Sequence, residues 1–187
     1  MIKNLSIRNS KNAKKGLIEL CQHMKNNSNS LITVGVEIGS FSGDSAKIFS
    51  SNFNTIYCVD QWKSNYDPTG IDLASDPNVY DMEEVEQYFD NIVKERKNII
   101  KIKKSSTEAV LSFSDFFFDF VYIDANHNYN SVCEDLELWI PKVKRDGFIC
   151  GHDYQKRFPG VIQAIHEVIG EPDAKFQDSS WLKKNVI

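Results

Sequence analysis

The sequence predicts an α/β fold, in which helices cover both faces of a mostly parallel β-sheet. Apolar runs typical of buried strands alternate along the chain with segments whose apolar residues recur at helical spacing. The inner apolar runs show little alternation with polar residues, which indicates strands that are buried on both faces. A chain of 187 residues can bury a sizeable core, and we expect a single domain over residues 1–187.

Apolar spacing and turn-forming residues define the elements of the N-terminal half. Residues 1–30 are interpreted as a helical extension, because the segment carries apolar side chains at helical spacing: Ala13, Leu17, Leu20, Cys21 and Met24. Two β-branched runs predict buried strands at residues 31–38 and 55–60. Ser42 is a suitable N-cap for the helix between these strands. A longer helix is expected at residues 82–96.

The C-terminal half continues the alternation of strands and helices. Short apolar runs predict three strands, at residues 99–102, 116–124 and 147–151. Two helices are expected to begin with capping boxes, Ser105-x-x-Glu108 and Ser131-x-x-Glu134. Pro159 is a suitable first residue for the last helix, which Gly170 would end. The tail is expected to form a closing hairpin across Asp178 and Ser179.

One long segment has no predicted secondary structure. Residues 63–80 read KSNYDPTGIDLASDPNVY, without a clear period and with two prolines and a glycine. Loops of this length in a compact domain are usually functional. We therefore interpret residues 63–80 as a lid loop.

The composition is that of a globular protein without a basic surface. Hydrophobic residues make up 41% and charged residues 26% of the chain, and the formal net charge is -4. This balance argues against nucleic acid as a partner, because nucleic-acid binders neutralise phosphates with clustered Lys and Arg. The four cysteines match neither a zinc site nor a disulfide framework, so we expect free thiols: Cys21, Cys58, Cys133 and Cys150.

No targeting signal or membrane span is expected. The N-terminal residues carry charge without a continuous apolar stretch, unlike a secretory signal. No segment reaches the roughly 18 apolar residues that a membrane span requires. We therefore predict a cytoplasmic protein. The sequence has no readable code for oligomeric state, and a homo-oligomer stays open.

The stretch VEIGSFSGDSA at residues 36–46 joins a predicted strand to a predicted helix. Turns of this kind let a backbone approach a ligand closely. The spacing Gly39-x-x-x-Gly43 is not the G-x-G-x-x-G dinucleotide fingerprint, and Asp44 stands where a P-loop needs its lysine. Glu37, at the end of the strand, would repel a phosphate. These features favour a cationic nucleoside without phosphate, for which the glycines make room.

Asp60 ends the second predicted strand, roughly 20 residues after the glycine turn. A carboxylate at this place in α/β nucleotide binders accepts hydrogen bonds from ribose hydroxyls. The alternative is that Asp60 only caps a turn, but its combination with the glycine turn favours the ribose role. Further polar residues, Glu37, Asp124 and Asp153, also stand at strand ends, where ligands of such sheets bind.

Four stretches in order resemble class I S-adenosylmethionine-dependent methyltransferases: VEIGSFSGDSA, IYCVDQW, DFVYIDANHNY and GFICGHDY. The likeness is strongest to the small bacterial O-methyltransferase-like group with a D-x-x-H-x-Y element after the fourth strand. It covers nearly the whole chain from about Thr33 onward. The resemblance implies a Rossmann-like, doubly wound, seven-stranded sheet that binds S-adenosylmethionine.

The resemblance also implies a set of cofactor-binding residues: Glu37, Gly39, Ser40, Gly43, Asp60, Gln61, Trp62, Ser105, Ser106 and Asp124. The acid and glycines of the turn would line the methionine and ribose portion of the cofactor. Asp60 would hold the ribose hydroxyls, with Gln61 and Trp62 beside the adenine. Ser105 or Ser106 falls where the family often has an aspartate near the adenine amine, so this contact departs from the pattern. Asp124 would lie close to the sulfonium.

Two histidines stand beside aspartates at adjacent strand ends, His127 after Asp124 and His152 before Asp153. An imidazole of near-neutral pKa can take a hydroxyl proton, so His127, His152 and Asp124 are candidate catalytic residues. Alternatively, Asp124 and Asp153 bind Mg²⁺ or another divalent cation that lowers the pKa of the acceptor. Some related O-methyltransferases have Asp-Asp or Asp-Asn at the second position, where this chain has His152-Asp153.

We therefore expect methyl transfer to a hydroxyl of a small molecule or glycan. A cofactor-binding protein without transfer activity and a redox or hydroxylase enzyme on the same scaffold are the alternatives. Methylases of nucleic-acid bases often carry an N-P-P-[YF]-like element after the fourth strand, where this chain has Asp124-Ala-Asn-His127. That difference and the acidic balance argue against base methylation.

Overall fold

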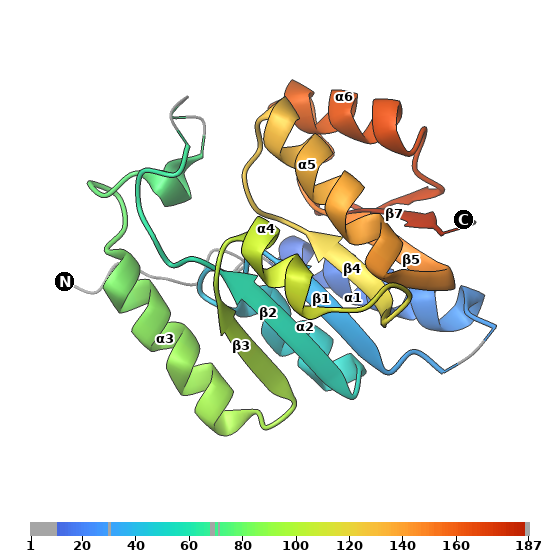
Figure 1. Cartoon of the computed structure of the whole chain (residues 1–187), viewed down its shortest axis with the longest axis horizontal. Helices are drawn as coiled ribbons and strands as arrows, with labels where there is room; N and C mark the ends of the chain where they lie inside the picture. The colour runs from blue at the N-terminus through green and yellow to red at the C-terminus, as the bar shows by residue number, and fades with distance from the viewer. Residues whose placement is uncertain (1–10, 30, 68–69, 71, 186–187) are drawn as a thin grey trace.

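The computed structural model describes residues 11–29, 31–67, 70 and 72–185. Its centre is a seven-stranded sheet in the order β3-β2-β1-β4-β5-β7-β6 (Figure 1). The strands are β1 Val34–Ile38, β2 Thr55–Asp60, β3 Ile99–Lys103, β4 Phe118–Ile123, β5 Val143–Gly151, β6 Ala174–Lys175 and β7 Trp181–Lys184. Strands β1 to β5 are parallel, whereas β7 runs antiparallel to both β5 and β6. This confirms the predicted mostly parallel sheet and the closing hairpin.

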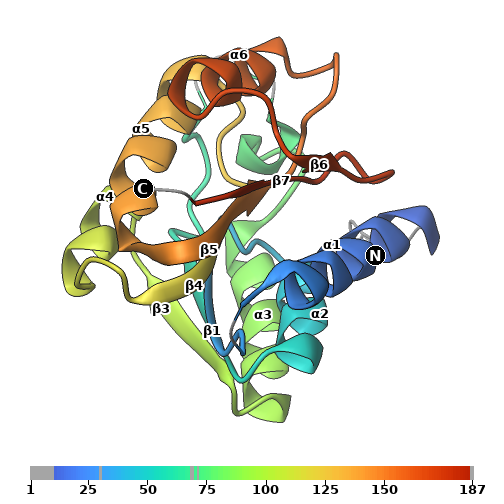
Figure 2. The same ribbon diagram turned by 90° about the vertical axis from the view of Figure 1, so that its right-hand side faces the viewer.

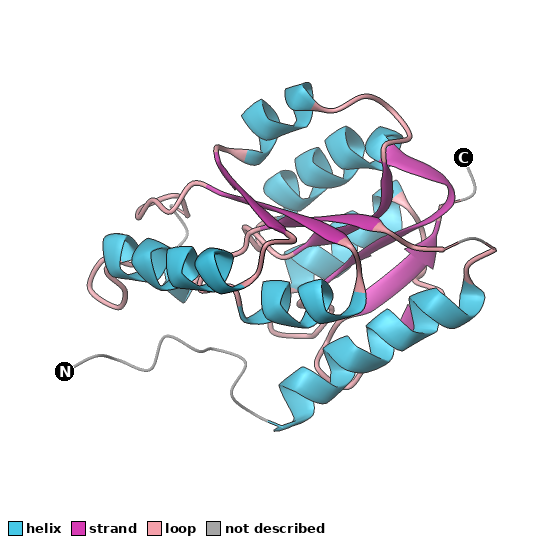
Figure 3. Cartoon of the chain, turned by 90° about the horizontal axis from the view of Figure 1, so that it is seen from below, coloured by secondary structure: helices cyan, strands magenta, loops and turns pink. Residues whose placement is uncertain are grey.

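Helices cover both faces of the sheet, as the sequence predicts (Figures 2 and 3). The α-helices are α1 Lys11–Asn27, α2 Asp44–Asn52, α3 Met82–Glu95, α4 Ser106–Ala109, α5 Tyr129–Trp139 and α6 Pro159–Val168. Helices α1, α2 and α3 pack on one face, and α4, α5 and α6 pack on the other. Short 3₁₀ helices lie at Leu73–Ser75, Val110–Ser112 and Ile140–Lys142.

Strand β4 shows why the inner strands are largely apolar. Phe120 and Tyr122 point into the core under α1, α2 and α3, whereas Phe118 and Val121 point into the core under α5 and α6. All four side chains are fully buried. A strand with a core on each face has no solvent side, so a polar side chain within it needs partners in the protein: Asp119, at the start of β4, accepts hydrogen bonds from the backbone N–H groups of Thr33 and Val34.

Two predicted helix caps are wrong. Helix α2 is capped by Gly43 and not by Ser42: Gly43 has φ 82°, a left-handed conformation that favours glycine, and no side-chain cap is present. Helix α5 is capped by Asn128, whose side-chain oxygen accepts a hydrogen bond from the backbone N–H of Ser131 at 3.0 Å. The predicted capping box at Ser131 therefore lies one turn too late. The capping box of Ser105 and Glu108 is confirmed.

Other predicted boundaries differ from the observed ones by a few residues. The strand predicted from residue 31 begins at Val34, and the strand predicted from residue 147 begins earlier, at Val143. Residues 1–10 and 30 of the expected helical extension lie outside the described part of the chain. None of the helices described is both long and apolar enough to cross a membrane. All four cysteines carry free thiols, as expected.

Candidate active site

A cavity of about 580 Å³ lies at the carboxyl ends of β1 to β5. Because these strands are parallel, the residues that follow each of them meet at one edge of the sheet. The lining includes most of the predicted site residues: Gly39, Ser40, Asp60, Gln61, Ser105, Ser106, Asp124, His127, His152 and Asp153. Three predicted residues, Glu37, Gly43 and Trp62, do not occur among the described residues that line it.

The two glycines of the β1 turn allow close packing against other elements. Gly39 has φ 88°, and a Cβ atom there would lie 2.2 Å from the backbone oxygen of Asp124. Gly39 therefore allows the turn after β1 to contact the end of β4. A Cβ atom at Gly43 would lie 2.8 Å from the ring of Phe89 in α3. Gly39 also lines the cavity, whereas Gly43 does not occur among the described lining residues, and the prediction that the glycines make room for the ligand stays a prediction.

Glu37 is fully buried beneath the turn. Its carboxylate accepts a short hydrogen bond from the hydroxyl of Ser45, and the thiol of Cys58 lies 3.7 Å from its other oxygen. Ser45 itself lines the cavity. Glu37 is thus linked to the cavity lining through its hydrogen bond with Ser45. The direct contact between Glu37 and a ligand stays a prediction.

Ser40 has a hydroxyl oxygen without a hydrogen-bond partner among the described residues, although its side chain is buried and lines the cavity. A buried hydroxyl costs free energy unless a partner satisfies it. A polar ligand group in the cavity would supply that partner.

Asp60 is held rigidly at the end of β2. One carboxylate oxygen accepts from the backbone N–H of Phe41 at 2.8 Å, and the other accepts from the backbone N–H of Trp62 at 2.7 Å. Burial raises the pKa of Asp60, and these backbone donors oppose the shift. The backbone N–H groups of Ser40 and Gln61 also lower the pKa of this carboxyl, so backbone donors from both neighbouring turns hold it. The carboxylate is therefore oriented by backbone donors and lines the cavity, and its contact with a ribose stays a prediction.

Trp62 lies in the hydrophobic core. Its ring packs on Phe89 with centroids 4.9 Å apart, and its indole N–H donates to the backbone oxygen of Phe41 at 2.9 Å. The side chain is 5% exposed. Gln61, by contrast, is exposed and lines the cavity. Of the two residues predicted beside the adenine, only Gln61 is placed where it can reach a ligand.

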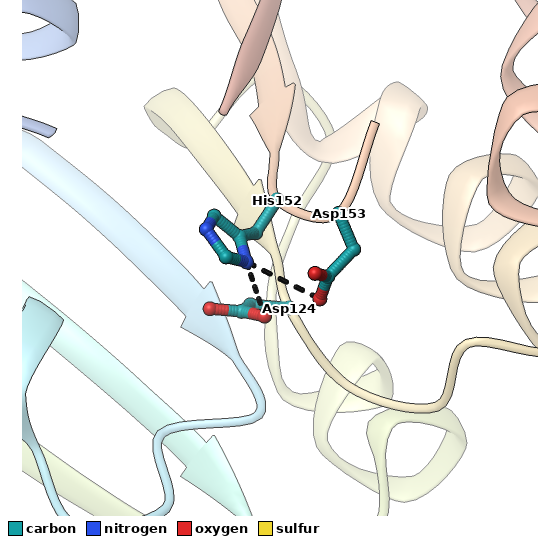
Figure 4. Close-up of side chains that lie close together, drawn as sticks. All are labelled: Asp124, His152 and Asp153. Carbon is teal, nitrogen blue, oxygen red and sulfur yellow. Dashed lines mark ion pairs between the residues drawn. The ribbon is translucent and has the colours of Figure 1, made fainter. Parts of the chain in front are cut away.

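Asp124, His152 and Asp153 converge at the ends of β4 and β5 (Figure 4). His152 Nδ1 lies 3.7 Å from an oxygen of Asp124 and 3.2 Å from an oxygen of Asp153. One potential ligand atom from each residue lies within 4.8 Å of the others, a separation that a divalent cation can bridge. Asp153 has φ 60°, a left-handed backbone conformation that is uncommon outside glycine and that occurs at functional sites.

His127 completes this cluster. Its Nε2 lies 2.7 Å from an oxygen of Asp153, and its ring packs on Phe158 with centroids 4.4 Å apart. Burial opposes the charged imidazole, but the hydrogen bond to Asp153 and the charges of Asp153, Asp72 and Asp124 outweigh it and raise the pKa of His127 to about 8. For Asp153, burial is likewise outweighed by hydrogen bonds from both histidines, which hold its pKa well below the usual range. The structure thus brings together the four residues that the sequence placed at these strand ends.

The segment 63–80 contributes residues that the sequence analysis did not name. Tyr66 and Asp72 line the cavity, and the Tyr66 hydroxyl donates to Asp72 at 2.5 Å. The same Asp72 oxygen lies 3.7 Å from Nδ1 of His127. Residues 68, 69 and 71 of the predicted lid lie outside the described residues. The sequence around Tyr66 and Asp72 has no apolar periodicity that could identify them as site residues. The conformation of the folded loop places Asp72 near His127 and Tyr66 beside Asp72.

Asp135 is the second residue that the sequence analysis missed. It lies on α5, is 5% exposed and lines the cavity. The available signal was its position: Val132, Asp135, Leu136 and Trp139 share one helical face, so an acid stands within an otherwise apolar stripe. Burial, reinforced by the charge of Glu134 and opposed by a hydrogen bond from Ser106, raises the pKa of Asp135 to about 6.

Comparisons with known proteins agree with this geometry. The solved structure of the O-methyltransferase NovP is similar over 94% of this chain and 80% of that chain, with 15% identity and a TM-score of 0.69. Cofactor-bound Rv0187 from MTB is similar over 96% and 82%, with 11% identity and a TM-score of 0.63. At these identities the likeness shows a shared fold.

A sequence relative covers less of the chain. A protein of Sinorhizobium fredii (strain NBRC 101917 / NGR234), y4gI, is 34% identical over 59 residues, which is 32% of this chain and 6% of that protein. The chain therefore matches only a small part of this relative's length.

The family model for the methyltransferase domain matches residues 36–154. This range runs from β1 to just beyond β5 and contains the turn, Asp60 and the Asp124–Asp153 cluster. Since the match spans more than half of the chain, this protein belongs to the methyltransferase domain family, as a class I S-adenosylmethionine-dependent methyltransferase.

Proposed function

We propose that this protein transfers a methyl group to a hydroxyl oxygen of a small molecule or glycan. The observation that carries the proposal is the hydrogen bond between His127 and Asp153, which lies beside Asp124 at the cavity. A hydroxyl is a weak nucleophile until its proton is removed, and an imidazole held by a carboxylate can accept that proton. O-methyltransferases such as NovP share the fold, which supports the oxygen acceptor.

The residues of the cavity fit S-adenosylmethionine. Asp60 would accept from the ribose hydroxyls, and the unpaired hydroxyl of Ser40 would bind a polar group of the methionine portion. Asp124 would provide negative charge near the sulfonium. When bound, S-adenosylmethionine supplies an electrophilic methyl group. The chain's own residues hold and orient the reactants at the carboxyl ends of β1 to β5.

Within the cluster, His127 is the candidate base. Asp153 accepts from its Nε2, so the ring would take the hydroxyl proton at Nδ1, which lies 3.7 Å from an oxygen of Asp72 and has no hydrogen-bond partner among the described residues. Both carboxylates would stabilise the imidazolium that forms. His152 contacts the same oxygen of Asp153 through its Nδ1 and is the second candidate. Positioning of the acceptor oxygen contributes more to the rate than proton removal does, because both reactants must be held in line.

A metal-assisted version of the same reaction is the second candidate. Asp124, His152 and Asp153 present one ligand atom each within 4.8 Å. They would hold a divalent cation, which would lower the pKa of the acceptor hydroxyl. Two carboxylates and one imidazole suit Mn²⁺ better than Mg²⁺, which prefers a shell of oxygen ligands.

The proposal is tested with methyl-labelled S-adenosylmethionine and a panel of acceptors that carry hydroxyl, amine or thiol groups. Label on oxygen in the product would support it. Label on nitrogen or sulfur alone would contradict the hydroxyl acceptor. Tight cofactor binding with no transfer to any acceptor would favour a cofactor-binding protein, and an oxidised product without label would favour hydroxylase chemistry. Calorimetry on the same sample should show binding of S-adenosylhomocysteine and none of NAD or ATP.

A further inference from the structure

The strand order places the cavity's functional groups in a row along the sheet edge. The His127 and Asp153 cluster follows β4 and β5, the glycine turn follows β1, Asp60 ends β2, and Ser106 lies just after β3. If methyl transfer occurs at the β4 and β5 end and Asp60 binds ribose, the nucleobase extends beyond Asp60 toward the loop after β3. This step rests on the proposed function.

That far end of the cavity holds a carboxylate from a different element. Ser106 begins α4, and its hydroxyl donates a short hydrogen bond to one oxygen of Asp135 on α5. The same hydroxyl accepts from the indole N–H of Trp139 at 2.8 Å. Trp139 and Ser106 therefore form a chain of donors that fixes the Asp135 carboxylate. Helix α4 packs beside α5 and contacts β2, and Figure 1 shows the two helices next to each other.

The second oxygen of Asp135 is the unusual feature. Among the described residues, no donor hydrogen-bonds to it, although the residue is 5% exposed and lines the cavity. If Asp135 only accepted a hydrogen bond from Ser106, its buried charge would cost free energy without a compensating interaction, because a neutral amide can make the same hydrogen bond. The carboxylate is explained if a ligand N–H reaches its second oxygen.

We infer that Asp135 recognises the exocyclic amine of the cofactor's adenine. The amine offers N–H donors, and Asp135 supplies the acceptor at the end of the cavity where neither Ser105 nor Ser106 provides a carboxylate. The Ser105 hydroxyl is already engaged by Glu108 in the cap of α4. Because the carboxyl pKa is raised only to about 6, the group is largely ionised near pH 7.5 and accepts strongly.

The test compares S-adenosylhomocysteine with its 6-deamino analogue, in which hydrogen replaces the amino group. Calorimetry at pH 7.5 on the whole native chain should show a preference of about tenfold or more for the amino compound, because a buried acceptor is left unpaired by the analogue. Equal affinities would overturn the inference while leaving the proposed function intact. If neither compound binds, the proposed function fails and this inference fails with it.

Two variants locate the effect. Asp135→Ala should reduce the preference to nearly one, whereas Glu137→Ala, an exposed carboxylate on the same helix, should keep it. Retention of the full preference in Asp135→Ala would overturn the assignment to this residue. The comparison of the two ligands on native protein needs no variant, so the inference stays testable if Asp135→Ala does not fold.

Discussion

The Nε2 atom of His127 lies 2.7 Å from a carboxylate oxygen of Asp153, at the point where β4 and β5 end side by side. His127 follows β4 and Asp153 follows β5, so the pair links the segments that come after these two strands. Both residues line the cavity. His152 approaches the same carboxylate at 3.2 Å. A single carboxylate therefore orients both candidate bases, which makes the contribution of each histidine separable by substitution.

His127→Ala should lower turnover by about 10²–10⁴-fold, because the variant loses the group that accepts the hydroxyl proton. Cofactor affinity should stay nearly unchanged. His166→Ala, which removes an exposed histidine outside the cavity lining, is the matched control and should retain native turnover. If a His127→Ala, His152→Ala double variant keeps native turnover, histidine-assisted chemistry is wrong.

The rate should also depend on pH in a defined direction. His127 accepts a proton only in its neutral form, and its pKa is raised to about 8. Turnover should therefore rise with pH below about 8 and become level above it. The measurement is turnover at saturating cofactor and acceptor from pH 6 to about 9.5, and a flat profile in the native protein would contradict the base role.

Chelation separates the two forms of activation. If a divalent cation activates the acceptor, a chelator should abolish turnover and Mn²⁺ should restore it, and Asp124→Ala and Asp153→Ala should be more damaging than either histidine substitution. If the histidines act alone, activity persists in chelator. Metal content of the purified protein, measured by mass spectrometry, provides an independent readout.

Asp60→Ala should weaken binding of S-adenosylhomocysteine by about 1.5–3 kcal/mol, because hydrogen bonds to a charged acceptor are lost. The carboxylate also holds the backbone N–H groups of Phe41 and Trp62, so Asp60→Asn should be compared to separate ligand contact from turn geometry. Asp115→Asn, an exposed acid outside the cavity lining, is the control. Calorimetry reports the affinities, and an unchanged affinity in both Asp60 variants would reduce Asp60 to a turn residue.

The segment 63–80 should become protected when cofactor binds. Tyr66 and Asp72 line the cavity, and Asp72 faces His127, so an occupied site gives the segment more to pack against. Amide hydrogen exchange with and without S-adenosylhomocysteine measures the change. Equal and strong protection in both states would show a rigid wall, and the lid interpretation would be wrong.

Asp135→Asn should become more stable relative to the native chain as pH rises. The carboxyl pKa is about 6 in the folded protein against an ordinary value of 3.8, so the contribution of this group to the free energy of unfolding is present at low pH and is lost as pH rises through about 6. Between pH 4.5 and 7.5 the difference in free energy of unfolding should shift by about 2 kcal/mol toward the variant. Urea unfolding at both pH values measures it, and a constant difference would contradict burial of the charge.

The sequence by itself determined the order of elements and the residues at the strand ends. Apolar periodicity and turn-forming residues are local properties of the sequence. They therefore predicted β2 at its observed bounds and located the polar residues at the carboxyl ends of β1, β2, β4 and β5. Helix caps were less certain, because Ser42 and Gly43 stand side by side and either suits a cap. The backbone conformation at Gly43 decided between them.

Tertiary structure alone decided which of these residues can reach a ligand. Trp62 follows Asp60 by two positions, yet its ring lies in the core on Phe89, and its indole N–H donates to the backbone oxygen of Phe41. Asp135 is 29 residues from Ser106, and only the packing of α5 beside α4 brings their side chains together at the cavity. Contacts between segments that are distant in sequence depend on how helices and strands pack. The apolar periodicity of each segment predicts its secondary structure but not the distance between two such segments.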